Sequence, residues 1–156
     1  MGLLNTISRG NASRTASRPT GIKLLEQLCD ENDWSIDARH GAGVALHFRG
    51  DSVTPERTVI AIAPEGDRRV GLTAVCRAKF TADMMPKQVM PCLLMRNEEV
   101  IVGGWACEEE DGVFSFKLKY TALAATLDAE AFKYICAAMI QEVAEIEAEM
   151  HERGVL

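Results

Sequence analysis

The last third of the chain carries its most regular pattern of hydrophobic and polar positions. Apolar side chains return there every three or four residues, which is the spacing of one face of an α-helix. The repeated positions are Phe132, Ile135, Met139, Val143, Ile146 and Met150. Asp128 stands just before this stripe, where an N-cap would be. The pattern predicts a long amphipathic helix, with a solvated side formed by Glu142, Glu145, Glu147, Glu149 and Glu152.

Two strands joined by a tight turn are predicted just before this helix. Residues 98–107 and 113–120 have the composition of strands, and the second segment alternates apolar and polar positions. Its apolar side is expected to carry Phe114, Phe116, Leu118 and Tyr120. Between the strands, Asp111 and Gly112 supply the positive φ that a tight hairpin needs. One face of this antiparallel sheet is therefore expected in a core, and the other partly in water.

The first half of the chain predicts one helix and then several strands. A helix is expected over residues 22–33, capped by Thr20, because apolar residues recur there at helical spacing. The strands are expected at residues 34–38, 44–48, 57–63 and 70–80. The third strand is nearly continuous in Val, Ile and Ala, which is compatible with cover on both of its faces. The fourth strand alternates and should bury one face.

A second helix is predicted between the two sets of strands. It should start at Thr81 or Asp83, which can cap it, and extend to about Arg96. Pro91 would then lie inside the helix and should kink or split it, because proline has no amide hydrogen and clashes with the preceding turn. Asn97 suits a left-handed position at the helix end.

Length and composition fit one globular domain. The chain has 156 residues, of which 47% are hydrophobic and 26% charged. Residues 1–21 hold three arginines and no acid, so the net charge of −6 for the whole chain becomes −9 for the rest. Such an acidic body would repel phosphate backbones, so we expect no nucleic-acid partner. The sequence has no apolar run of 18 residues, so we expect no integral membrane association.

The first 21 residues differ in composition from the rest. They are rich in Ser, Thr, Asn, Arg and Gly, and we predict that residues 1–21 form a disordered basic tail before a single α+β domain over 22–156. Two alternatives stay open. Residues 1–6 fit the N-myristoylation pattern, and the acid-free, arginine-rich composition also suits an organelle transit peptide.

The sequence contains no recognisable catalytic or metal-binding motif. The five cysteines are odd in number and widely spaced, which favours small buried side chains in a reducing compartment, and hence a cytoplasmic protein. We therefore predict no catalytic residue, no metal and no cofactor. An enzyme with a dispersed site remains a weaker alternative. It would need a deep pocket lined by polar residues such as His40, His47 or Arg49.

Two features could serve in binding another protein. The first is the group of methionines in the second helix, Met84, Met85, Met90 and Met95, because flexible methionines suit surfaces that accept varied partners. Ordinary packing of this helix on the sheet is the competing interpretation. The second is a sheet face expected to carry Ile101, Trp105 and Val113, which would be an apolar surface if no helix covers it.

The order of these elements resembles the YbjN-like family, which has the type III secretion chaperone-like fold. The resemblance rests on the helix ending at residues 93–97, the turn at 111–112, the strand ending at 118–120 and the long helix that follows. It covers about residues 22–150 by element order. It implies an α+β domain, an antiparallel sheet with helices packed on it, in the order helix, strands, helix, hairpin, long helix. Two departures are a fourth strand before the second helix, and Pro91; a roadblock- or longin-like module has similar elements.

The resemblance also implies a function. Such domains are often dimeric, with the contact on the second helix, and their sheet surfaces and first helices bind unfolded segments of client proteins. Our leading hypothesis is a non-enzymatic, cytoplasmic, chaperone-like or regulatory domain that forms a homodimer and binds a protein partner. The expected contact residues are Met85, Val89, Met90, Leu94, Ile101 and Trp105. The alternative is a membrane-peripheral or organelle-directed adaptor that acts through its basic tail.

Overall fold

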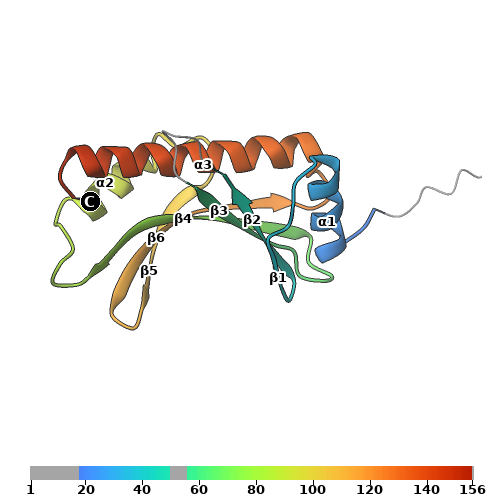
Figure 1. Cartoon of the computed structure of the whole chain (residues 1–156), viewed down its shortest axis with the longest axis horizontal. Helices are drawn as coiled ribbons and strands as arrows, with labels where there is room; N and C mark the ends of the chain where they lie inside the picture. Colours follow the sequence, from blue (N-terminus) through green and yellow to red (C-terminus); the bar gives the residue numbers. More distant parts are fainter. Residues whose placement is uncertain (1–17, 50–55, 156) are drawn as a thin grey trace, which may run out of the picture.

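The computed structural model describes residues 18–49 and 56–155, and these form three helices and six strands (Figure 1). The helices are α1 (Ile22–Glu31), α2 (Val89–Arg96) and α3 (Ala129–Glu152). The strands are β1 (Ala38–His40), β2 (Gly43–Phe48), β3 (Arg57–Ile62), β4 (Arg69–Thr81), β5 (Gly104–Glu110) and β6 (Val113–Leu123). The order of elements confirms the predicted α+β class. Residues 1–17 of the predicted tail lie outside the described part, so that expectation and its alternatives stay predictions.

All six strands belong to one antiparallel sheet in the order β1-β2-β3-β4-β6-β5. The first four strands follow one another, as short antiparallel connections allow. The chain then passes through α2 to the far edge and returns as β6 between β5 and β4. The β5–β6 hairpin turns at Asp111 and Gly112 as predicted, and both residues have positive φ angles, 51° and 78°.

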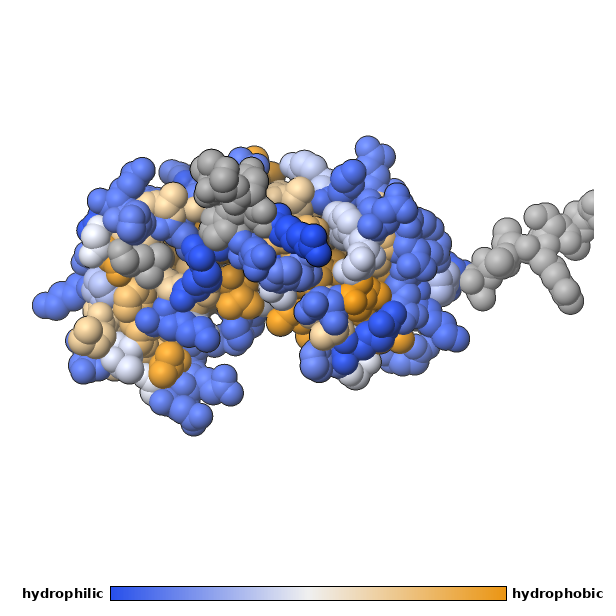
Figure 2. All heavy atoms as spheres, in the orientation of Figure 1, coloured by the Kyte–Doolittle hydropathy of each residue, from blue (hydrophilic) through white to orange (hydrophobic). Residues whose placement is uncertain are grey.

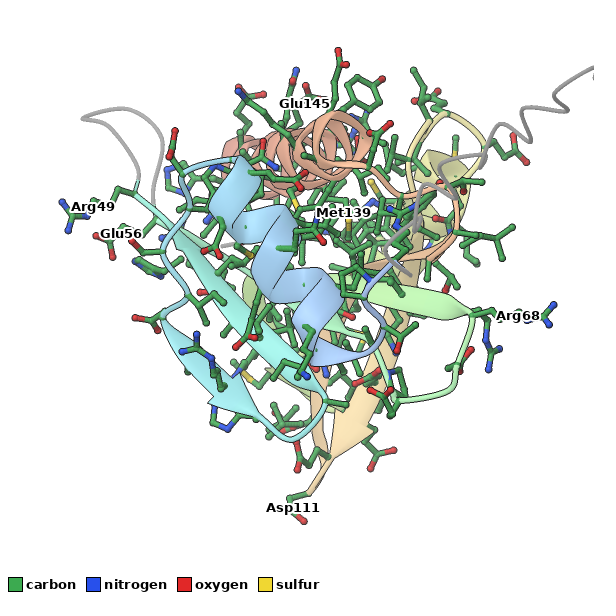
Figure 3. The ribbon with its side chains drawn as sticks, turned by 90° about the vertical axis from the view of Figure 1, so that its right-hand side faces the viewer. Arg49, Glu56, Arg68, Asp111, Met139 and Glu145 are labelled. Atoms are coloured by element: carbon green, nitrogen blue, oxygen red, sulfur yellow. The ribbon has the colours of Figure 1, made fainter. Side chains whose placement is uncertain are left out.

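The core lies between one face of the sheet and α3. Figure 1 shows α3 along the top of an arched sheet, with α1 and α2 near its opposite ends. Asp128 caps α3 by accepting a hydrogen bond of 2.8 Å from the backbone nitrogen of Ala131. The predicted stripe is fully confirmed, because every one of its six residues is buried. In Figure 3, Met139 points from α3 towards the sheet and Glu145 points away from it.

The opposite face of the sheet is open. Along β3 the odd positions are buried under the helices, whereas Ile60 and Ile62 are 37% and 45% exposed. Only one face of this strand is therefore covered, and the interpretation that both faces are covered is wrong. Its apolar run follows from strand propensity and a half-exposed hydrophobic face.

Several predicted boundaries shift. The first strand is β1 at residues 38–40 instead of 34–38, although Trp34 and Ile36 still pack against the core. Thr20 does not cap α1; its hydroxyl donates to Glu65, 3.0 Å away, and the helix starts after Gly21 with no side-chain cap. Residues 98–103 form turns and a bend, so β5 starts only at Gly104.

The second helix is shorter than predicted. It begins at Val89 rather than Thr81 or Asp83, which places Pro91 in its first turn, where an amide hydrogen would have no helical partner. The expected kink is therefore absent because the helix starts later. Asn97 has φ −62°, not the left-handed conformation. Its side chain instead accepts a hydrogen bond of 2.6 Å from the Trp105 nitrogen and donates one of 3.2 Å to the Trp105 carbonyl.

The pairing of β4 with β6 is interrupted where α3 crosses the sheet. The register shifts between Val75 and Lys79, which leaves a bulge around Arg77. Glu147 on α3 fills this gap: its carboxylate accepts a 2.7 Å hydrogen bond from the Arg77 backbone nitrogen and lies 2.7 Å from Nη2 of Arg57. The prediction that Glu147 is solvated is wrong, because the residue is only 4% exposed. The bulge and the buried arginine supply the donors that make this burial possible.

Candidate partner-binding surface

The outer side of α2 is the most apolar exposed helix surface in the described chain. Val89 and Leu93 point into the core and are 2% and 4% exposed. We call the opposite side the α2 stripe; its residues are Met90, Pro91, Leu94 and Met95, which are adjacent at helical spacing and all exposed. Leu94 and Met95 expose 65% and 71% of their surface. Contiguous exposed apolar side chains of this kind are typical of protein contact sites.

Charged side chains hold α2 in this orientation. Arg96, the last residue of α2, donates from Nε to Glu142 over 2.8 Å and from Nη2 to Glu145 over 2.6 Å, and both acids lie on α3. These hydrogen bonds raise the pKa of Arg96 further above its already high ordinary value, so it stays charged. The indole nitrogen of Trp105 donates to Glu142 over 3.0 Å. The side chains of Arg96 and Trp105 thus fix both α2 and β5 to α3.

The predicted contact residues divide between surface and core. Met90, Leu94 and Ile101 are exposed, at 37%, 65% and 89%. Val89 and Trp105 are buried, and Met85 is partly buried against the core. The methionines Met84 and Met95 are also exposed. The expected contact set mixed the two sides of the helix, because it included Val89, which shares the buried side with Leu93, beside the exposed Met90 and Leu94.

The predicted face with Ile101, Trp105 and Val113 does not form. Trp105 pairs with Leu118 across the strands and therefore lies on the core side, together with Cys107, which pairs with Phe116. Ile101 is in the bend before β5, where it lines an open groove with Tyr134 of α3. Gly103, with φ 95°, lets the chain pass close to β6, because a Cβ there would lie 2.9 Å from the Lys119 carbonyl oxygen.

The open face of the sheet offers a second apolar area. Ile60 and Ile62 lie there, on β3, and β6 contributes Lys117 and Lys119 nearby. Glu108 of β5 forms ion pairs with both lysines, and these hydrogen bonds lower the pKa of Glu108 to about 2. Figure 2 shows hydrophobic side chains in the recess below the arched sheet, between the β5–β6 hairpin and the β1–β2 hairpin.

The described residues show little reactive chemistry. Burial raises the pKa of Cys29 to about 11 and that of Cys76 and Cys136 to about 12, so these side chains are protonated thiols rather than nucleophiles. This confirms the expectation of small buried cysteines for these three. Within residues 18–49 and 56–155, no group of His, Cys, Asp and Glu could hold a metal ion.

The histidines do not converge on one pocket. His47 and Arg49 line one open recess, and His47 also contacts Glu56, 3.2 Å away. His40 lies at the end of β1 and does not line that recess. In the described part of the chain, no helix is long and apolar enough to cross a membrane.

No protein-family model and no curated protein sequence matches the chain. The solved structures that are similar to it include YbjN and two protein complexes. YbjN from E. coli, described as a candidate transcription regulator, has a TM-score of 0.58 at 14% identity, covering 86% of this chain and 93% of YbjN. The chain therefore has the YbjN-like, type III secretion chaperone-like fold.

The two other structures are complexes. The ExsC–ExsE complex matches with a TM-score of 0.56 at 18% identity, over 78% of this chain and 86% of that one. The HopA1–SchA chaperone–effector complex matches with a TM-score of 0.52 at 12% identity, over 78% and 88%. These matches confirm the fold predicted from the order of elements. The structure has the four strands before the second helix that the sequence predicted as a departure from the resemblance.

Proposed function

We propose that this protein is a non-enzymatic, chaperone-like or regulatory domain that binds another protein. The observation that carries the proposal is the α2 stripe, an exposed apolar side of the helix. Ion pairs between Arg96 of α2 and two glutamates of α3 keep this side facing away from the core. The fold supports it, because two of the similar structures are complexes of two proteins. The five free cysteines support a reducing compartment such as the cytoplasm.

We assign the α2 stripe to self-association. Met90, Leu94 and Met95 can pack against the same residues of a second copy around a twofold axis, which buries apolar surface on both protomers. The open sheet face would then remain free for an extended segment of a protein partner. Its apolar centre at Ile60 and Ile62, bordered by charged side chains, suits a partner with alternating apolar residues.

The self-association is tested by sedimentation equilibrium of Leu94→Asp. Leu94 is mostly exposed, so the variant should fold like the wild type, and its circular dichroism and melting temperature verify this. Ala125→Asp, which adds the same charge at an exposed loop position, is the matched control. We expect the wild type and the control to form dimers and Leu94→Asp to be a monomer. Dimers of equal stability in all three would refute the assignment.

Partner binding at the sheet is tested separately with Ile60→Thr/Ile62→Thr. Threonine keeps the branched shape that strands prefer but removes apolar surface. In a light-scattering assay with a chemically denatured reporter protein, we expect this variant to suppress aggregation less than the wild type does, while still forming dimers. Unchanged suppression would exclude the open face as the binding surface.

A further inference from the structure

The sheet is interrupted on both sides of β4 at one place. Strand β3 pairs with β4 only from Val59 to Ile62, so Arg57 and Thr58 have no partner in β4. On the other side, the β4–β6 pairing is broken between Val75 and Lys79. A hollow opens at this interruption, lined by His47, Glu56, Arg57, Thr58, Val75, Cys76, Arg77 and Lys79. Glu56, one of these residues, is labelled near Arg49 at the outside of the molecule in Figure 3.

This hollow is more basic than its surroundings. Three cations line it, Arg57, Arg77 and Lys79, in a chain whose net charge is −6. Two acids offset them. Glu147 contacts both arginines at 2.7 and 3.0 Å, and Glu56 contacts His47. One positive charge is therefore left over when His47 is neutral.

The buried arginine of this hollow has unused hydrogen-bond donors. Arg57 is 5% exposed, and only its Nη2 contacts Glu147. Its Nε and Nη1 are buried and have no hydrogen-bond partner in the described structure. Buried guanidinium nitrogens are normally satisfied, because an unmade hydrogen bond in the interior is costly. An anionic oxygen would accept hydrogen bonds from the unpaired Arg57 donors and would also neutralise the surplus positive charge.

We infer that the hollow between β3 and β4 binds an oxyanion, a carboxylate or a phosphate, through Arg57 with Arg77 and Lys79. Arg57 supplies the buried donors, and the exposed Arg77 and Lys79 supply charge at the entrance. Arginine suits planar or tetrahedral oxyanions because its donors are fixed in a plane. The site lies on different elements from the α2 stripe, so either assignment can fail without the other.

The test is a nuclear magnetic resonance titration of the full chain with inorganic phosphate and, separately, with succinate. Ionic strength is held constant with sodium chloride. We expect saturable shifts of the amides of residues 76–79 and of the Arg57 Nε–H signal. Saturation by phosphate alone identifies a phosphate site, and saturation by succinate alone a carboxylate site. Saturation by both establishes a general oxyanion site.

Two variants in the hollow and one control outside it test whether binding occurs there. Lys79→Ala removes an exposed charge and should weaken binding about tenfold, the usual order for a charge-assisted hydrogen bond. Lys87→Ala makes the same charge change at an exposed position outside the hollow and should leave affinity unchanged. Arg77→Ala should weaken binding by at least as much, provided its spectrum shows a folded protein.

Three results would overturn the inference. The first is the absence of a saturable shift with either anion. The second is equal weakening by Lys79→Ala and Lys87→Ala, which would indicate non-specific screening. The third is a persistent cross-peak from Arg57 Nε–H to a bound water that neither anion displaces, because that water would then satisfy the donor permanently.

Discussion

A cluster of ion-paired side chains lies where α3 crosses the bulge of β4. Its members are Arg57, Arg77 and Glu147. The Glu147 carboxylate accepts from Arg77 through both the backbone nitrogen and Nε, at 2.7 and 3.1 Å, and it contacts the buried Arg57. A charge buried in this way is tolerated only while its partners are present. The cluster therefore fixes the register of α3 on the sheet, in addition to the apolar stripe.

Replacing Glu147 by Gln should be strongly destabilising. Glutamine has nearly the same shape, but the variant leaves Arg57 buried without a counter-charge. We expect the free energy of unfolding in urea to fall by about 3–5 kcal/mol. Glu152→Gln, at an exposed position of the same helix, should change it by less than about 0.5 kcal/mol. A loss for Glu147→Gln as small as that of the control would show that the ion cluster does not hold α3 in place.

The carboxyl group of Glu108 should titrate at an unusually low pH. Its hydrogen bonds to Lys117 and then to Lys119 lower the pKa of its carboxyl from the ordinary value of 4.5 to about 2. Because the folded pKa is the lower one, the stabilisation is complete above pH 4.5 and is lost as the pH falls towards 2. Carbon-13 detected titration of the Glu108 carboxyl in the folded protein should give a midpoint well below the ordinary value of 4.5. A midpoint near 4.5 would mean that the lysines do not engage it.

At the scale of elements, the sequence predicted the long helix, the second strand of the hairpin and the long fourth strand well, because each has a sustained period of its own. It failed where the structure depends on partners distant in the chain. Glu147 repeats the pattern of its solvated neighbours, and only the bulge of β4 makes it a buried residue. Likewise, Val89 was expected among the surface contact residues, but it packs into the core, which depends on how α2 lies against the sheet.

The attachment of α2 to α3 should depend on Arg96. In Arg96→Gln, the hydrogen bonds to Glu142 and Glu145 are weakened, so α2 should open locally while the sheet stays folded. We expect faster hydrogen exchange in residues 89–96 and unchanged exchange in β4 and β6. The control is Arg153→Gln, which removes an ion pair with Glu149 within the end of α3. Uniformly faster exchange throughout the domain would instead mean that Arg96 supports global stability.

At the scale of the whole molecule, the parts form one arched sheet with a covered and an open face. Helix α3 covers the convex side, α1 and α2 lie near its two ends, and the concave side is open (Figure 1). The sequence predicted this α+β architecture through the order of elements. It could not show which apolar residues remain exposed, since that depends on how α2 and α3 pack. The proposed function uses two exposed areas, the α2 stripe for self-association and the concave face for a partner.

Hydrogen–deuterium exchange of the wild type at a series of protein concentrations is the most direct test of self-association through α2. If two copies pair through α2, residues 89–96 should gain protection as concentration rises, and the strands at the sheet edges, β1 and β5, should not. Leu94→Asp should abolish the concentration dependence. Protection that appears along β1 or β5 instead would mean that the copies join edge to edge, and exchange that never depends on concentration would contradict self-association altogether.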